Sequence, residues 1–478
     1  MVMLPAFPMI FLATAILAVL LLGALRDEDE GSRVVMPVAI AALIITGLLI
    51  IASDKGPVDV FGGHLLIDGF SSFLSILVII GAVLCLVMTP GQLRRLDADR
   101  FEVPVIALVA TLGMLLMISA NSFLALYMAL ELQSLPLYVM TAIRRDDVRS
   151  TEAGLKYFVL GALASGILLY GCSLVYGFTG TLSFPALAGT FGADNPLPNG
   201  AITGLVFIAA GLAFKISAVP FHMWTPDVYE GAPTPVTAFL AAAPKVAAMG
   251  LILRVFMQPF GSFVDQWQQV IVFISIASML LGAFAAIGQT SIKRLLAYSS
   301  IGHVGYALVG LSAGTERGVY AVMIYMAIYL FMTVGSFACV MALRRQDYQI
   351  SRIEEFAGLG RTQPMMALAL AIFMFSLAGI PPLAGFFGKL YVFMAAVEQG
   401  LIGLAVIGVL ASVVGAYYYL RIVKLMYFDE PKDAFDRPVS GELGFVVTLT
   451  AAFTLLFCLY PSPLLTRAQA AAATLFIQ

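Results

Sequence analysis

The chain has 478 residues, of which 61% are hydrophobic and 11% are charged, and its formal net charge is −2. A soluble domain carries roughly 25% charged residues, so this composition excludes an ordinary soluble protein. The apolar runs are long enough to cross a bilayer as helices, and they lack the alternating pattern of a β-barrel. We therefore expect an all-α polytopic membrane protein, with residues 1–478 forming a single membrane domain.

Apolar stretches of about 20 residues, the length that crosses the hydrocarbon core, predict about fourteen transmembrane helices. In chain order they cover residues 5–25, 34–52, 69–89, 103–119, 122–142, 154–178, 202–223, 235–256, 268–288, 295–313, 319–343, 365–395, 401–426 and 443–460. The first stretch has no basic residues before it, so we expect a first span and not a signal peptide.

The basic residues are distributed unevenly between the two sides of the predicted membrane. With the N-terminus outside, the connecting loops on the inner side hold most of the lysines and arginines. The outer side then holds only Lys55, Arg254, Arg317 and Arg467. Because cytoplasmic loops carry an excess of basic residues, this asymmetry predicts an even number of spans with both termini on the periplasmic side.

Two of the predicted spans are interrupted by proline. The seventh contains Pro220, and the twelfth contains Pro381 and Pro382. Proline removes a backbone donor and clashes with the preceding turn, so each helix is expected to break there. The breaks lie five spans apart, which favours two inverted repeats at 103–256 and 268–426 with discontinuous helices at equivalent positions. Two unrelated proline kinks are the alternative.

Five ionisable residues fall inside predicted spans: Glu131, Lys156, Lys215, Lys245 and Lys389. Charges are costly in the hydrocarbon and usually mark an ion or proton pathway. Lys215 lies one turn before the first break, and Glu131 is its expected partner, although a static ion pair that fixes helix packing is the alternative. Lys156 lies near the inner end of its span, where it could instead reach the interface.

The other candidates lie near the centre of the predicted spans. Lys245 follows Pro244 among small alanines, and Lys389 follows the second break. His222 and His303 could pass protons, because histidine titrates near physiological pH, or each could be a hydrogen-bonded structural residue. Cys85, Cys172, Cys339 and Cys458 are far apart, and no CxxC pair or carboxylate–histidine cluster exists. We therefore expect no metal and no redox centre in this chain.

Three short runs carry a family resemblance. They are FHMWTPDVYEGAPTPV at 221–236, KRLLAYSSIGH at 293–303 and GIPPLAGF at 379–386. These runs resemble the antiporter-like subunits of respiratory complex I, and the resemblance covers nearly the whole chain. The YEGAPTPV form is similar to subunit N rather than to subunits L or M. Lysine at position 389 also argues against subunit M, and the long lateral helix of subunit L is expected to be absent.

The resemblance implies a proton-translocating membrane subunit of NADH–quinone oxidoreductase in a bacterial inner membrane. Electron transfer elsewhere in the complex would drive proton pumping through a relay, with no catalytic redox residue here. The relay residues of the family map onto Glu131 and Lys215 as a pair, Lys245 as the central group and Lys389 as the terminal one, with Lys156, His222 and His303 at further family positions.

The resemblance also implies where cofactors and partners lie. NAD, FMN, iron–sulfur clusters and quinone are expected in other subunits. Expected partners are the antiporter-like subunit M, small subunits such as K and J, and lipids, without nucleic acid. An Mrp-type cation/proton antiporter subunit is the main alternative, because it shares the fold and the lysines. A structural spacer that only anchors its neighbours is the third interpretation.

Overall fold

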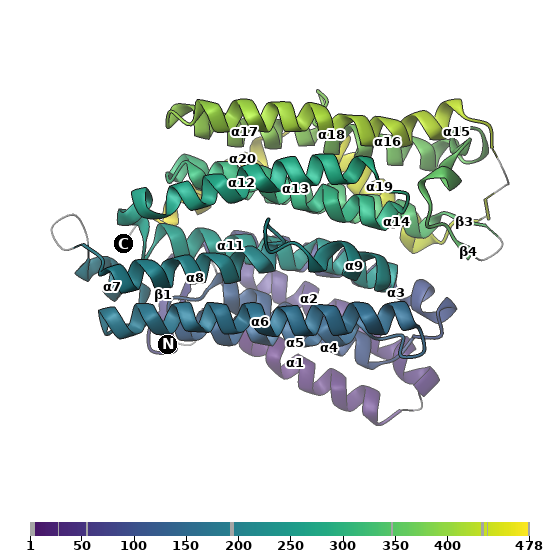
Figure 1. Cartoon of the computed structure of the whole chain (residues 1–478). Helices are drawn as coiled ribbons and strands as arrows, with labels where there is room; N and C mark the ends of the chain where they lie inside the picture. Colours follow the sequence, from purple (N-terminus) through teal and green to yellow (C-terminus); the bar gives the residue numbers. More distant parts are fainter. Residues whose placement is uncertain are drawn as a thin grey trace.

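The structure is a computed structural model that describes residues 5–26, 28–53, 56–191, 196–345, 348–431, 435–436 and 438–476, with the backbone alone for residues 28–32. Within these ranges α-helices dominate, and the long helices lie side by side in one bundle (Figure 1). Lys55, which the sequence places on the outer side, lies outside the described residues.

The first part of the chain contains a hairpin between its helices. The helices are α1 (Phe7–Ala24), α2 (Glu28–Ser53), α3 (Gly69–Arg95), α4 (Glu102–Ile118), α5 (Phe123–Thr141), α6 (Val148–Thr179) and α7 (Phe184–Thr190). The strands β1 (Val58–Val60) and β2 (Leu65–Ile67) pair antiparallel.

The middle of the chain follows with α8 (Asn199–Ile216), α9 (Trp224–Gly231), α10 (Thr234–Ala241), α11 (Ala243–Met257), the 3₁₀ turn η1 (Gly261–Phe263), α12 (Val264–Ile287), α13 (Ile292–Ser312) and α14 (Glu316–Ala342). The last part contains β3 (Arg344–Arg345) and β4 (Tyr348–Gln349), η2 (Ile353–Phe356), α15 (Leu359–Thr362), α16 (Pro364–Ala378), α17 (Ala384–Glu398), α18 (Ile402–Phe428), α19 (Gly441–Leu456) and α20 (Ser462–Thr474). The helix α20 was not predicted, and it packs against α3 and α14.

The helices confirm a polytopic membrane protein. Among the described residues, 11 helices are long and apolar enough to cross a membrane. Shorter apolar helices at Glu102–Ile118, Pro364–Ala378 and Gly441–Leu456 correspond to further predicted spans. The count of about fourteen spans, which follows from the roughly 20-residue requirement, stays a prediction.

Both predicted helix breaks are present, and they have the same backbone geometry. Helix α8 ends at Ser217, with φ of 64°, and helix α16 ends at Gly379, with φ of 88°. In each case the next residue donates its N–H back to a carbonyl five residues earlier: Ala218 to Ala213 at 2.8 Å and Ile380 to Phe375 at 3.0 Å. This is the Schellman ending of a helix, and it leaves the remaining terminal carbonyls for other partners.

A third break was missed. The predicted span 235–256 is two helices, α10 and α11, which meet at Ala242 with φ of −105° and ψ of −90°. The cause is Pro244, which has no N–H to donate to the preceding turn. The break lies directly before Lys245, so it changes the direction from which that lysine enters the bundle.

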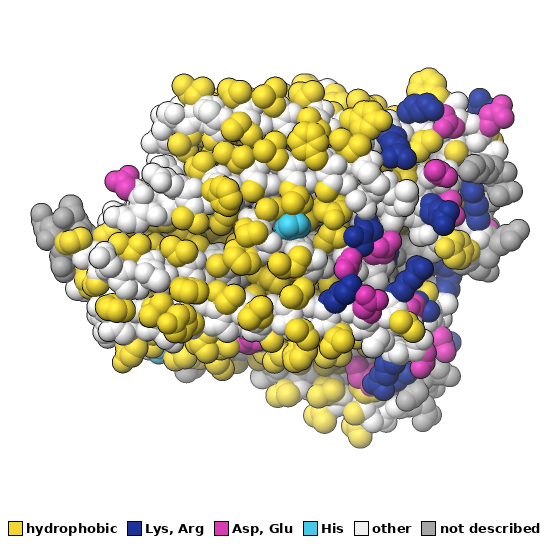
Figure 2. All heavy atoms as spheres, viewed as in Figure 1, with side chains coloured by type: hydrophobic (Ala, Val, Ile, Leu, Met, Phe, Trp, Pro, Cys, Tyr) yellow, Lys and Arg dark blue, Asp and Glu magenta, His cyan; other side chains and the backbone are white. Residues whose placement is uncertain are grey.

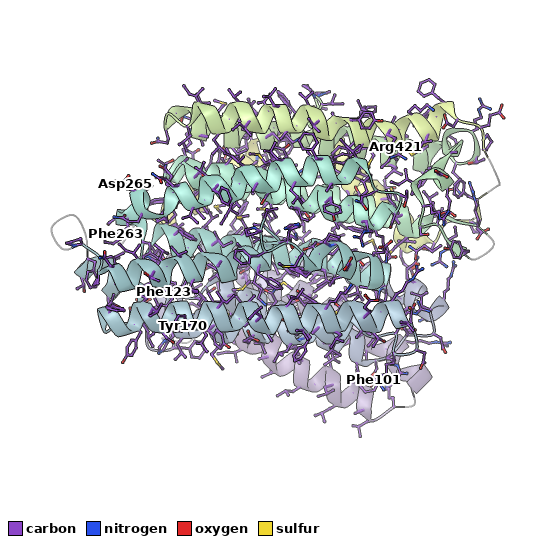
Figure 3. The ribbon with its side chains drawn as sticks, in the orientation of Figure 1. Phe101, Phe123, Tyr170, Phe263, Asp265 and Arg421 are labelled. Atoms are coloured by element: carbon purple, nitrogen blue, oxygen red, sulfur yellow. The ribbon has the colours of Figure 1, made fainter. Side chains whose placement is uncertain are left out.

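Charge separates the two ends of the bundle. Figure 2 shows basic and acidic side chains gathered at one end, while hydrophobic side chains cover most of the rest of this face. In Figure 3, Phe101 and Arg421 lie toward this charged end, and Phe123, Phe263 and Asp265 lie toward the opposite end. Both chain termini are marked on the side away from the charges, as an even number of crossings requires (Figure 1).

Candidate functional site

The amine of Lys215 is buried at the first break, but it does not touch Glu131. Its side chain, 9% exposed, ends in an ammonium that donates to Ser134 Oγ at 2.7 Å and to Tyr138 Oη at 3.3 Å. Within the described residues no ion pair of 4.0 Å or less joins Lys215 to Glu131, although the two charges interact. The direct pair expected from the sequence is therefore replaced by an ammonium held on hydroxyl groups near the carboxylate.

Glu131 lies on the outward face of α5. This face carries the exposed side chains of Leu124, Met128, Leu135 and Val139, which recur at helical spacing. One carboxylate oxygen of Glu131 is buried and has no hydrogen-bond partner in the part of the chain that is described. A buried carboxylate oxygen without a hydrogen-bond partner is costly, so Glu131 calls for a polar neighbour.

Lys245 joins the first break from a different helix. It lies near the start of α11, is 1% exposed, and donates from Nζ to the carbonyl oxygen of Ile216 at 3.1 Å. This carbonyl is one of those left without an intrahelical partner where α8 ends. Ile216 follows Lys215 directly in the chain, so the amine of Lys245 is bound to the backbone of the residue next to Lys215.

Lys389 binds the second break in the same manner. Its Nζ donates to the carbonyl oxygens of Leu377 at 3.2 Å and Ala378 at 2.9 Å, and to Ser412 Oγ at 2.7 Å. The ammonium also lies 4.7 Å from the centroid of the Tyr306 ring, within range of a cation–π interaction. Each predicted break is thus the docking point of a buried amine.

His303 is buried at 3% exposure and is hydrogen-bonded through both ring nitrogens. Nδ1 lies 2.6 Å from Tyr325 Oη and Nε2 lies 3.2 Å from Tyr419 Oη. Lys389 is close enough to act on it electrostatically. His222 lies in the first break and is half-buried, with an Nδ1 that has no partner among the described residues.

Lys156 lies at the charged end of the bundle and is not a buried group. Its side chain is 41% exposed and pairs with Glu152 and Asp227, each at 2.7 Å. Asp227 also accepts from Arg294 at 2.7 Å. These residues line a cavity of 330 Å³. This position fits the interfacial alternative for Lys156, whose partner Asp227 could not be predicted from the sequence.

The electrostatics of Asp227 follow from this cluster. Partial burial alone would raise the pKa of its carboxyl group, but the hydrogen bonds from Lys156 and Arg294 outweigh that effect, so the pKa lies below its ordinary value. Asp227 is therefore ionised at neutral pH. The cluster ties α6, α9 and α13 together at the mouth of the bundle.

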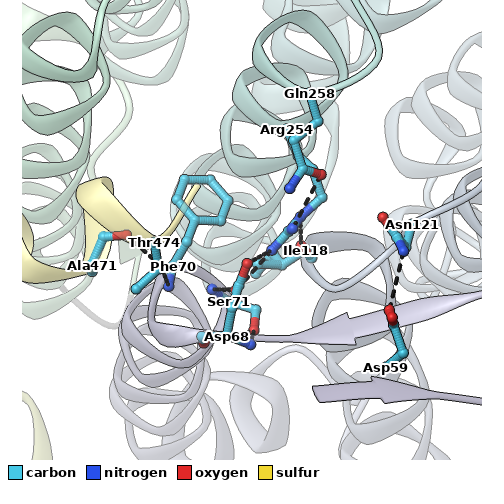
Figure 4. Close-up of polar contacts among 10 residues, drawn as sticks. All are labelled: Asp59, Asp68, Phe70, Ser71, Ile118, Asn121, Arg254, Gln258, Ala471 and Thr474. Carbon is cyan, nitrogen blue, oxygen red and sulfur yellow. Dashed lines mark hydrogen bonds and ion pairs between the residues drawn. The ribbon is translucent and has the colours of Figure 1, made fainter. Parts of the chain in front are cut away.

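A buried ion pair was missed entirely by sequence reasoning. Arg254, assigned above to the outer side, has a side chain that is 0% exposed and pairs with Asp68, which is also 0% exposed (Figure 4). Arg254 also donates to the carbonyl oxygen of Ile118 at 2.8 Å. The side of Arg254 stays a prediction, but its burial was not expected, because a basic residue near a span end looks like a loop charge when its buried partner, 186 positions away, is unknown.

The described residues contain no group of three or more His, Cys, Asp or Glu side chains that could hold a metal ion. The polar groups described above are amines, hydroxyls, imidazoles and a few carboxylates, which donate and accept protons in hydrogen bonds.

Comparison with known proteins places this arrangement in a family. Residues 120–415 match the family described as "NADH:quinone oxidoreductase/Mrp antiporter, TM". The chain is 58% identical to NADH-quinone oxidoreductase subunit N of Parvibaculum lavamentivorans over 99% of this chain and 97% of the relative. It matches a chain of respiratory complex I from Thermus thermophilus with 33% identity and a TM-score of 0.83, over 97% and 99% of the two chains.

A further solved structure shares the fold alone. A chain of the Mrp complex from Dietzia sp. DQ12-45-1b matches with a TM-score of 0.87 at 23% identity, over 100% of this chain and 98% of that one. The identity to the subunit N relative is far higher, at 58% against 23%. The chain therefore belongs to the NADH:quinone oxidoreductase/Mrp antiporter family of membrane proteins, within which it groups with NADH-quinone oxidoreductase subunit N.

Proposed function

We propose that this chain moves protons across the membrane as a non-redox subunit of an NADH–quinone oxidoreductase. The observation that carries the proposal is that Lys215, Lys245 and Lys389 are all buried, at 9%, 1% and 7% exposure, and all rest on neutral oxygens. A buried ammonium without a carboxylate in contact is held weakly in its charged form. Such an amine can release and regain a proton when a neighbouring charge changes.

The order of transfer follows the contacts. A change of charge near Glu131 acts on Lys215. The amine of Lys245 binds the carbonyl oxygen of Ile216, the residue that follows Lys215 at the break. From Lys245 the proton passes through His303 to Lys389. Lys156, with Asp227 and Arg294, forms the inner mouth. His222 lies in the break between α8 and α9. Both termini are then periplasmic, because the charged end faces the cytoplasm.

The helix contacts support the proposed repeats at 103–256 and 268–426. Helix α4 packs on α5 as α12 packs on α13, and α6 packs on α8 as α14 packs on α16 and α17. Helix α11 contacts α4 as α18 contacts α12. Two five-helix units that share these contacts, each with a helix broken at proline in the equivalent position, are what inverted repeats produce.

The outward face of α5 supports the proposal of a neighbouring membrane subunit. Leu124, Met128, Leu135 and Val139 are each at least 50% exposed, which suits either lipid or protein. Glu131 lies on the same face and suits only a protein with a polar or basic group. We assign this face to a partner subunit of the complex, with M, K and J as candidates and the redox cofactors held elsewhere.

The proposal is tested by charge removal in the assembled complex. Lys215→Ala and Lys245→Ala should abolish NADH-driven proton uptake into membrane vesicles. The matched control is Lys424→Ala, whose amine is 63% exposed and paired with Asp429. Full pumping and full quinone reduction in both buried-lysine variants would end the proposal. A sodium-dependent proton flux without NADH would instead support the Mrp-type alternative.

A further inference from the structure

A second polar cavity lies at the charged end of the bundle, next to the cavity of Lys156 and Asp227. It has a volume of 370 Å³, and Arg149, Glu230 and Gly231 line both cavities. Its walls include the loop between α5 and α6, the ends of α9 and α10, the start of α13 and the segment that follows α14. Sites for small ligands span about 300–1,000 Å³, so this cavity has room for one small molecule.

Basic side chains outnumber acidic ones around this second cavity. Six charged residues line it, four basic and two acidic. Each of the two acids already has a basic partner: Asp147 binds Arg144, and Glu230 binds Arg294. Three basic side chains are left without an ion pair in the described ranges: Arg149, Lys293 and Arg352. Cations that are not neutralised around a cavity attract an anion to it.

Two of these cations lie where helix electrostatics favours acids. Arg149 is in the first turn of α6 and Lys293 is in the first turn of α13, and neither turn contains an acidic residue. Asp147 caps α6, but Arg144 neutralises its charge. The first turn of a helix carries a partial positive charge and unpaired N–H groups, so it favours a bound anion and disfavours a cation. The helices and the side chains therefore add to the same positive potential.

Neutral hydrogen-bond donors complete the lining. The hydroxyl groups of Thr290 and Ser351 line the cavity, and so does the side-chain amide of Gln349. Nε2 of Gln349 is buried and has no hydrogen-bond partner in the part of the chain that is described, whereas Oε1 accepts from Thr234 at 3.2 Å. A buried N–H group without an acceptor is costly. An anion in the cavity would supply the missing acceptor.

The cavity lies away from the lipid. Three of the spans that end beside it are those of α10 with α11, of α13 and of α14, and their most apolar windows are 100%, 94% and 94% buried. Neighbouring helices, and not lipid chains, thus surround these spans. Figure 2 shows basic and acidic side chains gathered at this end of the molecule. A ligand therefore reaches the cavity from the water at the charged end.

We propose that this cavity binds the phosphate group of a small water-soluble molecule, through Arg149, Lys293 and Arg352. Arginine matches phosphate geometry with two parallel N–H donors. Lys293 Nζ donates to the carbonyl oxygen of Ala232 at 2.7 Å and has two further N–H groups for the anion. The Gln349 amide supplies a neutral donor.

The bound anion would join the two proposed repeats at this end of the bundle. Arg149 belongs to the unit at 103–256, whereas Lys293 and Arg352 belong to the unit at 268–426. The inference goes beyond the proposed proton transfer and does not depend on it.

The test is arginine footprinting of the intact complex in mild detergent. Phenylglyoxal labels exposed arginines, and mass spectrometry reads each one. Inorganic phosphate is the probe, and chloride at equal ionic strength is the reference. Phosphate at about ten times its Kd should slow the labelling of Arg149 and Arg352 about tenfold, because protection grows with the ratio of ligand concentration to Kd. Arg145 is the matched control, since it is exposed, lies four residues before Arg149 and is outside the lining, so its labelling should not change.

A substitution distinguishes one shared site from separate effects on each arginine. Arg352→Gln should abolish the protection of Arg149, although the two residues come from different repeats. Arg145→Gln should leave that protection intact. Both substituted residues are exposed, so neither change disturbs a packed interior. Protection of Arg149 that survives in Arg352→Gln would overturn the shared site, as would equal slowing at Arg145.

Lipid nanodiscs distinguish the two sources of a phosphate group. Protection by dissolved phosphate in phosphatidylcholine discs supports a water-soluble ligand. Protection that appears without dissolved phosphate, and only in discs that contain phosphatidylglycerol, assigns the cavity to a lipid headgroup and overturns the soluble ligand. Unchanged labelling of Arg149 and Arg352 under all conditions overturns the anion site. Lys245→Ala should show the same protection as the unsubstituted complex, so the footprint and the pumping assay can fail independently.

Discussion

The ion pair between Arg254 and Asp68 gives the sharpest stability prediction. The guanidinium binds both carboxylate oxygens, at 2.8 and 3.0 Å, and both side chains are 0% exposed. Replacing Arg254 by methionine leaves the Asp68 charge buried without its partner, which costs about 3–5 kcal/mol. Asp68 also caps α3 by accepting from the N–H of Ser71 at 2.7 Å, so its own replacement by alanine costs about 1 kcal/mol more.

The assay is a double-variant cycle on the thermal stability of the complex in mild detergent. Arg254→Met and Asp68→Asn should each lower the melting midpoint, and the double variant should lose less than the two single losses combined. Arg317→Met is the control, because Arg317 and Glu398 form an exposed pair, at 55% and 41%, worth about 0–1 kcal/mol. Equal losses in Arg254→Met and Arg317→Met would refute the reasoning, as would strict additivity in the cycle.

Three further predictions follow from the site, and the first two use matched pairs of positions. Gly161→Ala should reduce proton pumping, because its Cβ would lie 2.1 Å from Tyr138 Oη, a ligand of Lys215. Gly166→Ala should leave pumping unchanged, because its Cβ has no described neighbour within 4 Å. Gly379→Ala and Gly400→Ala share a positive φ costing about 1–2 kcal/mol, but only the first places a Cβ 3.1 Å from Lys389 Nζ, so only the first should impair pumping. The ion pairs of Asp227 should be intact above the ordinary pKa of its carboxyl group and lost only as pH falls through the lowered pKa. An infrared band of a protonated carboxyl group at pH 5 that disappears in Asp227→Asn would contradict this.

The buried lysines and the two predicted breaks could be read from the sequence, because both depend on local chemistry. A lysine within an apolar run and a proline at mid-span are unusual wherever the chain folds. The ligands of those lysines could not be read in this way. The carbonyl of Ile216 is a ligand of Lys245 because α8 ends there and α11 lies beside it, and both facts are tertiary. The expected contact between Glu131 and Lys215 is missing from the described structure for the same reason.

Lys156 and Arg254 show what depth along a span leaves undecided. Both were judged by depth along a span, and depth does not tell which way a side chain points. Lys156 lies within α6 yet reaches the surface and two carboxylates, while Arg254 lies near the end of α11 yet points to the interior. The break at Ala242 was missed because Pro244 can also start a helix. The choice between these two roles of proline depends on the packing of α10 and α11.

The span that contains α10 and α11 is 100% buried over its most apolar window. A helix with protein on every side cannot tilt or slide without opening voids in its neighbours, because interiors are close-packed. Any movement that Lys245 makes must then come from its own flexible side chain, while the backbone of α11 stays in place. Rotamer changes of this kind take place within nanoseconds in free side chains, far faster than helix displacements. The rate of turnover can thus be set by events at the surface of the molecule, while the helices at its centre do not move.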